Sequence, residues 1–434
     1  MSTTSDQSAP GSPSDVLIQR PLPVELLLRE GSPFDPPTAL RELGEQAPVS
    51  RVELRNGAPL WMVTGYAESR SVLTDSRFSA DTQRHPNAMQ LTPAQVPGHR
   101  SAVEDGTGGC PVDDRPHTDG LFIFMDPPEQ TRLRRLLVGQ FTVRRMRALE
   151  SRVREIAVEH VEAMRAAGAP ADLMAGFALP LPSLVICELL GVAWEDRAEF
   201  QERSAVQTNL ALSDEVRMRA RLEMREFMAR LVADKRAHPA DDIISGLIHG
   251  GADPALTDEE LVDLSSMLLG AGHETTANML ALGTFALLEH PEQLAALRAD
   301  PGMIDGAVEE LLRYLSVIHT GPVRVAVEDV ELGGVTIRAG ETAMIALPEV
   351  NRDPSQWSEP AELDLTRERN HHLAFGHGVH QCLGQQLARV EMRIGLVELL
   401  QRLPGLRLAA PVADVPLRTD MIVFGVHSLP VAWD

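Results

Sequence analysis

The sequence has few cysteines and almost no lysine. Three cysteines are too few, and odd in number, for a disulfide scaffold, so each thiol needs its own explanation. Lys235 is the single lysine among 40 basic residues, which we interpret as codon bias. Basic residues are also outnumbered, because 62 acidic residues leave a formal charge of -22. This charge disfavours binding to phosphate backbones and anionic lipid surfaces, so we expect no nucleic-acid partner.

The chain also lacks a long uninterrupted hydrophobic run. The longest apolar stretch, 178–194, is broken by two prolines and by Glu188, whereas a membrane span needs about 20 apolar residues. Residues 1–15 are small and polar, with neither the basic start nor the apolar stretch of a signal peptide. We expect a disordered tail over 1–15, one domain over 16–434, no membrane association and a cytoplasmic location.

Most of the chain has the pattern of amphipathic helices separated by proline and glycine. Alternating residues predict a hairpin over 49–66, turning at Asn56-Gly57, and short strands over 323–347. The sequence therefore predicts a mainly α fold with small β-sheets.

Residues 85–120 hold five prolines, five glycines and five acidic residues, without a periodic apolar pattern. A loop of this length in a compact domain is typical of a lid or a binding element. A disordered surface insertion would have the same composition, so both interpretations stay open. Cys110 lies in this loop and is expected to be incidental, whereas Cys187, in the apolar run LVICELL, is expected to pack in the core.

The longest helix signal begins with a capping box at Thr257 and continues to about Glu289, which is roughly 48 Å of helix. Gly270 and Gly272 each weaken a helix by about 1 kcal/mol relative to alanine. Polar residues 274–276 follow them. This pattern predicts a local break where polar side chains face a cavity, and close helix packing at small residues is the alternative.

Cys382 stands just before a strong amphipathic helix. The helix dipole and backbone N–H groups there are expected to lower the thiol pKa and to favour a thiolate metal ligand. Glycines at 376, 378 and 384 let the backbone pass close to a flat, bulky group. A zinc site built from Cys382 with His371, His372, His377 and His380 is the alternative. It would need a second cysteine or a carboxylate cluster, and it leaves the glycines unexplained.

Three segments together resemble the cytochrome P450 family in its soluble bacterial form. Phe375-Gly376-x-Gly378-x-His380-x-Cys382-x-Gly384 is similar to the family's haem-binding signature. Ala271-Gly272-His273-Glu274-Thr275 is similar to its oxygen-activating helix, and Glu310-Leu311-Leu312-Arg313 to its E-x-x-R pair. The resemblance covers roughly residues 16–434. It implies one helical domain of this type that binds haem b through Cys382 and uses O2 as co-substrate.

The resemblance also implies site residues. Glu274 and Thr275 are expected to be catalytic, because an acid and an alcohol together can manage the protons that oxygen activation consumes. A haem sensor without catalysis would be favoured if this pair were absent. The expected cofactor contacts are Gln130, where relatives often carry histidine, Arg134, Arg324, Phe375, Gly376, His380, Cys382 and Gly384. The expected substrate pocket includes Leu268, Ala271, Gly272, Val317, Ile318, His319, Thr320 and Ile422, and the expected structural salt bridges join Glu310, Arg313 and Arg367.

Residues 130–147 contain six arginines and no acid. A solvated helix face would explain them, but the resemblance places this helix on the cysteine side of the haem, where an acidic ferredoxin docks. Docking is then expected near Arg132, Arg135, Arg144 and Arg145. The chain shows no flavin or dinucleotide segment, so the resemblance implies a separate ferredoxin, an NAD(P)H-dependent reductase and a monomeric enzyme.

The overall pattern is similar to bacterial enzymes that tailor polyketides and other secondary metabolites. The resemblance therefore implies insertion of one oxygen atom into a mostly apolar small molecule. Hydroxylation, epoxidation and oxidative ring formation are all compatible with the sequence.

Overall fold

A computed structural model describes residues 22–54, 57–82, 120–193, 196–209, 212–251, 255–319, 321–368, 371–419, 421 and 423–434. The tail expected at 1–15, Cys110 and nearly all of 85–120 lie outside these ranges. So do Thr320 and Ile422, two of the expected pocket residues.

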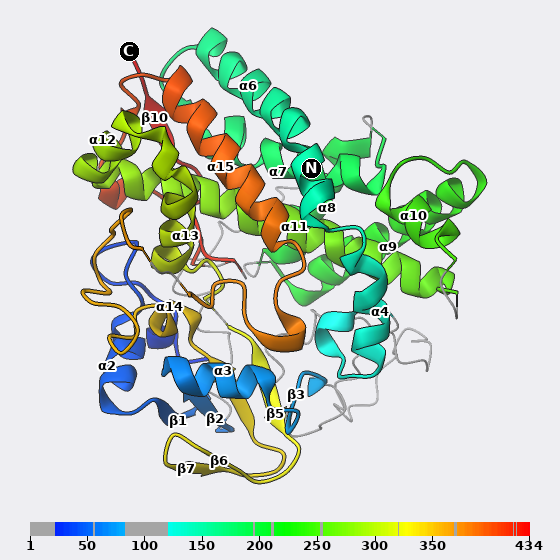
Figure 1. The fold of residues 1–434 in the computed structure, drawn as a ribbon, viewed down its shortest axis with the longest axis vertical. Coiled ribbons are helices and arrows are strands. Elements are labelled where there is room, and N and C mark those ends of the chain that lie inside the picture. The colour runs from blue at the N-terminus through cyan, green and yellow to red at the C-terminus, as the bar shows by residue number, and fades with distance from the viewer. Residues whose placement is uncertain are drawn as a thin grey trace, which may run out of the picture.

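Helices dominate the described chain, as expected for a mainly α fold (Figure 1). They are η1 (Val24–Leu26), α2 (Thr38–Gln46), α3 (Tyr66–Thr74), η4 (Phe122–Phe124), α4 (Glu129–Val138), α5 (Val143–Ala148), α6 (Glu150–Ala167), η5 (Met174–Ala178), α7 (Pro180–Leu190), α8 (Arg197–Thr208), α9 (Asp214–Ala237), α10 (Ile243–His249), α11 (Asp258–Glu289), α12 (Pro291–Ala299), η7 (Pro301–Met303), α13 (Ile304–Leu315), α14 (Leu347–Val350), η8 (Gly378–His380), α15 (Gln385–Arg402) and η9 (Val412–Asp414). Among the described residues, no helix is both long and apolar enough to cross a membrane.

Small sheets lie at the edges of the helical mass. The strands are β1 (Val49–Glu53), β2 (Pro59–Val63), β3 (Phe78–Ser79), β4 (Ala171–Asp172), β5 (Val323–Ala326), β6 (Val330–Leu332), β7 (Val335–Ile337), β8 (Thr342–Ile345), β9 (Arg407–Leu408) and β10 (Pro430–Ala432). They form a five-stranded sheet in the order β1-β2-β8-β5-β3, a three-stranded sheet β4-β10-β9 and the two-stranded ribbon β6-β7. The predicted hairpin is confirmed, because β1 pairs antiparallel with β2 and Val49 lies opposite Val63.

Helix α11 crosses the centre of the molecule, behind α15 in the view of Figure 1. Its predicted start is confirmed: the Thr257 side chain accepts from the Glu260 backbone N–H, and the Glu260 side chain accepts from the Thr257 N–H. Its predicted end at Glu289 is confirmed as well. The main core packs α11 against α7 and α15, and Cys187 of α7 is buried there as expected.

The predicted break in α11 is wrong, because the helix runs without interruption from Asp258 to Glu289. A Cβ added at Gly272 would come within 3.0 Å of Ile186 in α7, so this glycine permits close helix packing. The long buried face of α11 outweighs a cost of about 1 kcal/mol for each glycine.

Candidate active site

The turn between Phe375 and Gly384 holds Cys382 at the start of α15. The Cys382 backbone N–H donates to the Phe375 carbonyl at 2.8 Å, which closes the turn. Gly378 has a φ of 71°, and a Cβ there would come within 2.5 Å of the Leu73 carbonyl oxygen, so only glycine fits this approach to α3. The turn therefore fixes the thiol, whose side chain is exposed to an internal cavity.

The expectation of a lowered Cys382 pKa is wrong for the free thiol. Burial raises the pKa of Cys382, and this effect exceeds the opposing effects of the Gly384 and Gln385 backbone N–H groups and of Arg134 and Arg389. The N–H groups act in the predicted direction, but the apolar surroundings dominate. A thiolate at this position therefore needs a positive partner within the cavity, such as a metal ion.

The cavity that contains the Cys382 thiol has a volume of about 330 Å³ and a mostly apolar wall. Its lining comes from η4, α4, α7, α11, α13, the segment after α13, the cysteine turn and α15: Phe122, Ile123, Arg134, Phe141, Ile186, Met267, Leu268, Ala271, Gly272, Thr275, Thr276, Met279, Leu312, Val317, Ile318, Pro322, Leu347, Ala374, Phe375, Gly376, His380, Gln381, Cys382, Leu383, Gly384, Leu387, Ala388, Glu391 and Met392. Segments far apart in sequence thus enclose one apolar space with the thiol on its wall.

Most of the expected pocket residues line this cavity. Leu268, Ala271 and Gly272 do so from α11, and Val317 and Ile318 from the segment after α13. His319, the next residue, is not part of the lining.

Buried in the wall instead, His319 places its ring Nε2 3.1 Å from the Met421 carbonyl oxygen. We therefore find no contact between His319 and the described part of the cavity.

The two expected catalytic residues separate in the structure. Thr275 lines the cavity, and its hydroxyl donates to the Ala271 carbonyl at 2.9 Å. Glu274 is absent from the described lining and is buried beside Arg418, with 3.2 Å between Glu274 Oε1 and Arg418 Nη2. Adjacent residues on a helix point about 100° apart, which explains why they reach different surroundings.

A positively charged cluster lies beside the cysteine turn. Burial lowers the pKa of Arg324 to about 10, and Asp126 opposes this effect. Burial also lowers the pKa of His380 to about 4, with Arg324 and Arg134 adding to the shift. The buried Nδ1 of His380 has no hydrogen-bond partner among the described residues. Two arginines and an imidazole whose charged forms are disfavoured by burial are typical of a site that binds anionic groups such as carboxylates.

Gln130 plays a different part from the one expected. It is buried, it is absent from the described lining, and its side-chain Nε2 donates to the Val379 carbonyl at 2.8 Å. This hydrogen bond connects α4 to η8, the turn that precedes Cys382, and stabilises that turn.

A second group of residues supports the cysteine turn from outside, and sequence reasoning did not find it. The Arg389 guanidinium lies 4.6 Å from the centroid of the Phe375 ring. Glu309 accepts from Arg389 Nε at 2.6 Å and lies 3.2 Å from His372 Nε2. Glu309 therefore pairs with Arg389, which lies 80 residues away in the chain. The Glu309–Arg389 pair depends on the packing of α13 against α15, which the sequence alone does not reveal.

The three residues expected to form structural salt bridges do so. Arg313 is fully buried and donates from Nη2 and Nε to the two Glu310 oxygens at 2.7 and 2.8 Å. Arg367 Nε lies 3.2 Å from Glu310 Oε2. Arg313 also donates to the carbonyls of Asn351, Pro360 and Glu362, so it ties α13 to the segment that leads to the cysteine turn.

The arginine-rich segment forms α4 and α5, on the same side as the cysteine turn. Arg134 reaches the Gln381 carbonyl, next to Cys382. Arg132 pairs with Glu260, and Arg145 lies 3.7 Å from Asp241, so these two are already engaged.

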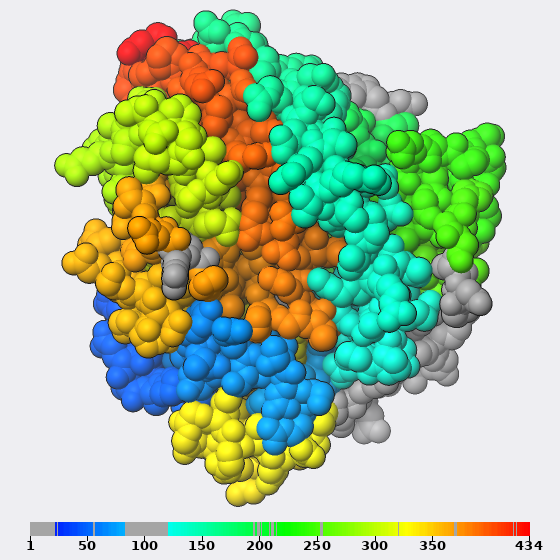
Figure 2. Space-filling model, in the orientation of Figure 1, coloured from blue at the N-terminus to red at the C-terminus, as the bar shows by residue number. Residues whose placement is uncertain are grey.

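Arg135 and Arg144 of the same segment are exposed. Figure 2 shows α4, α5 and the start of α15 together on one face of the molecule. Of the four arginines expected to bind a ferredoxin, Arg135 and Arg144 are therefore the two whose side chains are exposed to solvent.

The zinc alternative is not supported. Within the described ranges no group of three or more His, Cys, Asp and Glu side chains could hold a metal ion. His372 contacts Glu309, and His377 Nε2 lies 3.2 Å from Arg70.

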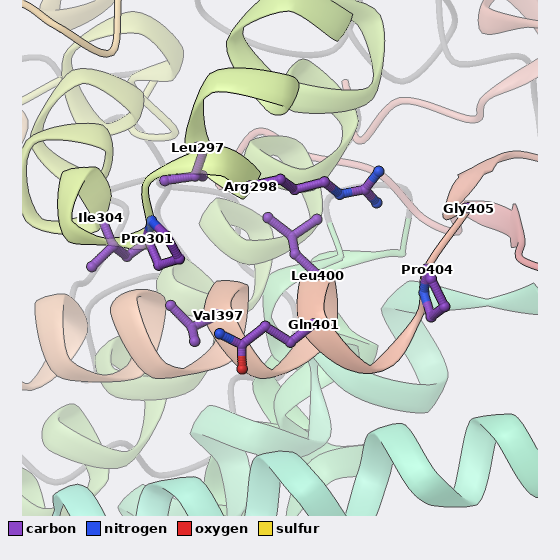
Figure 3. Close-up of a pocket in the computed structure, with 9 residues that line it drawn as sticks. All are labelled: Leu297, Arg298, Pro301, Ile304, Val397, Leu400, Gln401, Pro404 and Gly405. Atoms are coloured by element: carbon purple, nitrogen blue, oxygen red, sulfur yellow. The ribbon is translucent and has the colours of Figure 1, made fainter.

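A separate pocket of about 300 Å³ lies between α12, α13 and α15 (Figure 3). It is lined by Leu297, Arg298, Pro301, Ile304, Val397, Leu400, Gln401, Pro404 and Gly405. None of these residues also lines the cavity with Cys382. The thiol cavity is therefore the candidate active site.

A flat cofactor with acidic side groups fits the residues of this site. The thiol would supply a ligand to the metal of such a cofactor, and Gly376 and Gly384 have open space where a Cβ would stand. The Arg134 guanidinium and the His380 imidazole would contact its acidic groups. Across the cavity, α11 presents the Thr275 hydroxyl. The fold and the site thus define a haem-thiolate protein.

Comparison with known proteins gives the family. The sequence profile named Cytochrome P450 matches residues 302–409. Cytochrome P450 105C1 from a Streptomyces species is 48% identical over 400 residues, which is 92% of this chain and 96% of the relative. Pentalenic acid synthase from Streptomyces avermitilis is 45% identical over 404 residues, 92% and 95% of the two chains.

A solved structure agrees with these relatives. The crystal structure of CYP105P1 in complex with filipin I matches with a TM-score of 0.85 at 41% identity, covering 95% of this chain and 99% of that one. The chain belongs to the cytochrome P450 family, and it is a P450 monooxygenase of the CYP105 type. The family implies haem with a cysteine thiolate ligand and O2 as co-substrate.

Proposed function

We propose that this enzyme inserts one oxygen atom from O2 into a mostly apolar small molecule, with Cys382 as the thiolate ligand of haem b. The observation that carries the proposal is the Cys382 thiol, which faces the same apolar cavity as the Thr275 hydroxyl. When bound, the haem would supply the activation of O2, and the thiolate favours O–O cleavage.

The roles of the chain's own residues follow from their places. Arg134, Arg324 and His380 would hold the haem propionates, whose negative charge would stabilise the charged forms that burial disfavours. Thr275 would orient a proton at its hydroxyl toward the cavity. Glu274 would pass protons to the site from the side of Arg418, and the apolar wall keeps bulk water out.

The substrate is proposed to be a polyketide or another secondary metabolite. The lining supports this class, because Leu268, Val317 and Ile318 offer apolar contacts and few polar groups. The relatives support it too, since one is named for pentalenic acid and one was crystallised with filipin I. Hydroxylation, epoxidation and oxidative ring formation are all compatible with this site.

Electrons are proposed to come from a ferredoxin and its NAD(P)H-dependent reductase, with no bound flavin or nicotinamide. The exposed Arg135 and Arg144 near the cysteine turn support docking of an acidic partner on this face. We propose that the enzyme acts as a monomeric single domain over 16–434, in the cytoplasm.

The experiment that tests this function is the spectrum of the reduced, CO-bound protein. Wild type should show the Soret band of thiolate-ligated haem, and Cys382→Ala should lose it. Retention of that band in Cys382→Ala, or tightly bound zinc in place of haem in wild type, would overturn the assignment. Cys187→Ser is the matched control and should keep the band, because Cys187 is a buried thiol that is not part of the described cavity lining.

A further inference from the structure

Helix α9 carries arginines toward the part of α11 that lines the cavity. The two helices pack against each other (Figure 1). Near the C-terminal end of α9, Arg236 pairs with Asp258 of α11. Earlier in α9, Arg225 pairs with Asp263, which lies further along α11. The two helices therefore run in opposite directions, so residues that precede Arg225 approach the stretch of α11 that lines the cavity.

Two further arginines precede Arg225 on the same face of α9. Arg221 stands one helical turn before Arg225, and Arg217 one turn before Arg221. On the partner helix, Met267 follows Asp263 by one turn. Because Arg225 contacts Asp263, helix geometry places Arg221 at the level of Met267. Met267 lines the cavity, so Arg221 lies at the cavity's edge between α9 and α11.

The space beside this part of α11 is open. Gly270 is exposed, and no atom outside the adjoining helix backbone lies within 4 Å of the position that a Cβ would take there. Gly270 stands three residues after Met267, on the same side of α11. Ala271, the next residue, lines the cavity. A molecule bound in the cavity can therefore extend past Gly270 toward the arginines of α9.

Arg221 has no counter-ion among the described residues. It makes no hydrogen bond or ion pair with any of them, and its Nη1 atom is buried without a partner. Nearby acids are engaged by other arginines, since Asp263 pairs with Arg225 and Glu223 Oε2 lies 3.6 Å from Arg203 Nε. An arginine that only covers apolar surface with its stem keeps its guanidinium in water, which the burial of Nη1 contradicts.

The surroundings of Arg221 disfavour its charge. Burial lowers the pKa of Arg221 to about 10, and the positive charge of Arg217 adds to this shift. The guanidinium still carries its charge at neutral pH, and like charges one turn apart destabilise a helix. Packing alone favours an uncharged side chain at this position, such as the methionines at 224 and 228, which are buried on the same face. An anion bound beside Arg221 would offset this cost, which gives the charge a physical reason.

We propose that Arg221, assisted by Arg217, binds a carboxylate at one end of an otherwise apolar substrate. The inference rests on the proposed function and narrows its substrate class. A guanidinium donates two parallel N–H groups to a carboxylate, which fixes the direction of the ligand as well as its charge. The apolar body of the substrate then lies along Met267 and Ala271 and reaches the part of the cavity that holds Cys382. Arg221 thereby determines which carbon of the substrate is presented for oxidation.

The test measures how the full-length haem-loaded enzyme binds ω-imidazolyl alkanoic acids, which carry an imidazole at one end and a carboxylate at the other. The imidazole binds the iron and shifts the Soret band, so a spectral titration gives the dissociation constant without turnover. Acids of graded chain length are compared with the corresponding ω-imidazolyl alcohols. At the length that reaches Arg221, wild type should bind the acid about tenfold more tightly than the alcohol, because a charged hydrogen bond is stronger than a neutral one. Arg221→Gln should lose this preference, and Arg221→Lys should keep part of it.

Arg219→Gln is the matched control and should keep the wild-type preference, because Arg219 is an exposed arginine of α9 that lies 3.5 Å from Glu215. Equal affinity of wild type for acid and alcohol at every chain length, or an unchanged preference in Arg221→Gln, would overturn the inference. If Arg221→Gln does not fold, Arg217→Gln must weaken binding of the acid more than that of the alcohol, and an equal effect on both would reject the proposal. If wild type itself lacks the thiolate CO band, the proposed function fails, and this inference fails with it.

Discussion

Glu274 of α11 and Arg418 of the C-terminal segment form a buried ion pair, with 3.2 Å between Oε1 and Nη2. Their exposed fractions are 4% and 7%, so neither charge is well hydrated. The proposed proton path through Glu274 must therefore pass the Arg418 side of α11, whereas Thr275 faces the cavity directly.

Glu274→Gln should affect stability and turnover together. It leaves Arg418 buried without its main counter-charge, which should lower the free energy of unfolding by about 3 kcal/mol. Turnover should fall as well, because the carboxylate that passes protons is lost. The double variant Glu274→Gln with Arg418→Met removes both charges and should recover much of the stability. Denaturant unfolding and NADH oxidation rates separate the effects, and wild-type turnover in the double variant would contradict the catalytic role of Glu274.

Thr275→Ala should keep haem and substrate binding but divert reducing equivalents into hydrogen peroxide. The hydroxyl that orients a proton toward the cavity is lost, while the thiol and the apolar wall remain. The matched control is Thr284→Ala, since Thr284 makes the same bond to the carbonyl four residues back but does not line the cavity. The measurement is the amount of product and of peroxide formed per NADH consumed in each variant. Equal ratios in the two variants would show that Thr275 acts only through helix packing.

Arg135→Glu should slow reduction by ferredoxin, by about tenfold at low salt, because charges at the rim of an interface act mainly on the encounter rate. The difference should shrink as the ionic strength rises and screens the charges. Arg338→Glu is the control and should leave the rate unchanged, because Arg338 is an exposed arginine directly after β7. Stopped-flow measurements of reduction by ferredoxin, over a range of salt concentrations, give the rate and its salt dependence for each variant. Equal salt dependence in the two variants would place docking elsewhere.

Local signals predicted the elements that local chemistry determines. The capping box at Thr257, the end of α11 at Glu289 and the hairpin of β1 and β2 all depend on residues close in sequence. The turn that presents Cys382 was predictable for the same reason, since its glycines lie within ten residues of the thiol in the chain.

Pairings between distant segments could not be predicted in this way. Arg418 lies 144 residues from Glu274, and Arg389 lies 80 residues from Glu309. The sign of the Cys382 pKa shift depends on burial by the whole fold, which exceeds the effect of the neighbouring N–H groups. Glu391 gave one sequence signal, an acid between the apolar residues Val390 and Met392 of α15, but its place on the cavity wall needed the packing of α15 on α11.

Glu391 should also make the stability of the protein depend on pH. Its pKa is about 8 in the folded protein and ordinarily 4.5. Between these values the unfolded chain releases the proton while the native protein retains it. The unfolded state therefore binds fewer protons, and the free energy of unfolding falls as the pH rises, by up to about 1.4 kcal/mol per unit. Below pH 4.5 both states are protonated and the contribution is fully present.

Glu391→Gln and Glu391→Leu remove this titration. The stability of each variant relative to wild type should therefore increase as the pH rises from 5 toward 8. This window is set by the Glu391 pKa, which changes from 4.5 in the unfolded chain to about 8 in the folded protein. Urea unfolding at constant ionic strength, followed by circular dichroism at each pH, gives the difference directly. Since all other groups titrate alike in the three proteins, the difference isolates position 391. A difference that stays flat across this window would mean that Glu391 is already ionised in the folded protein.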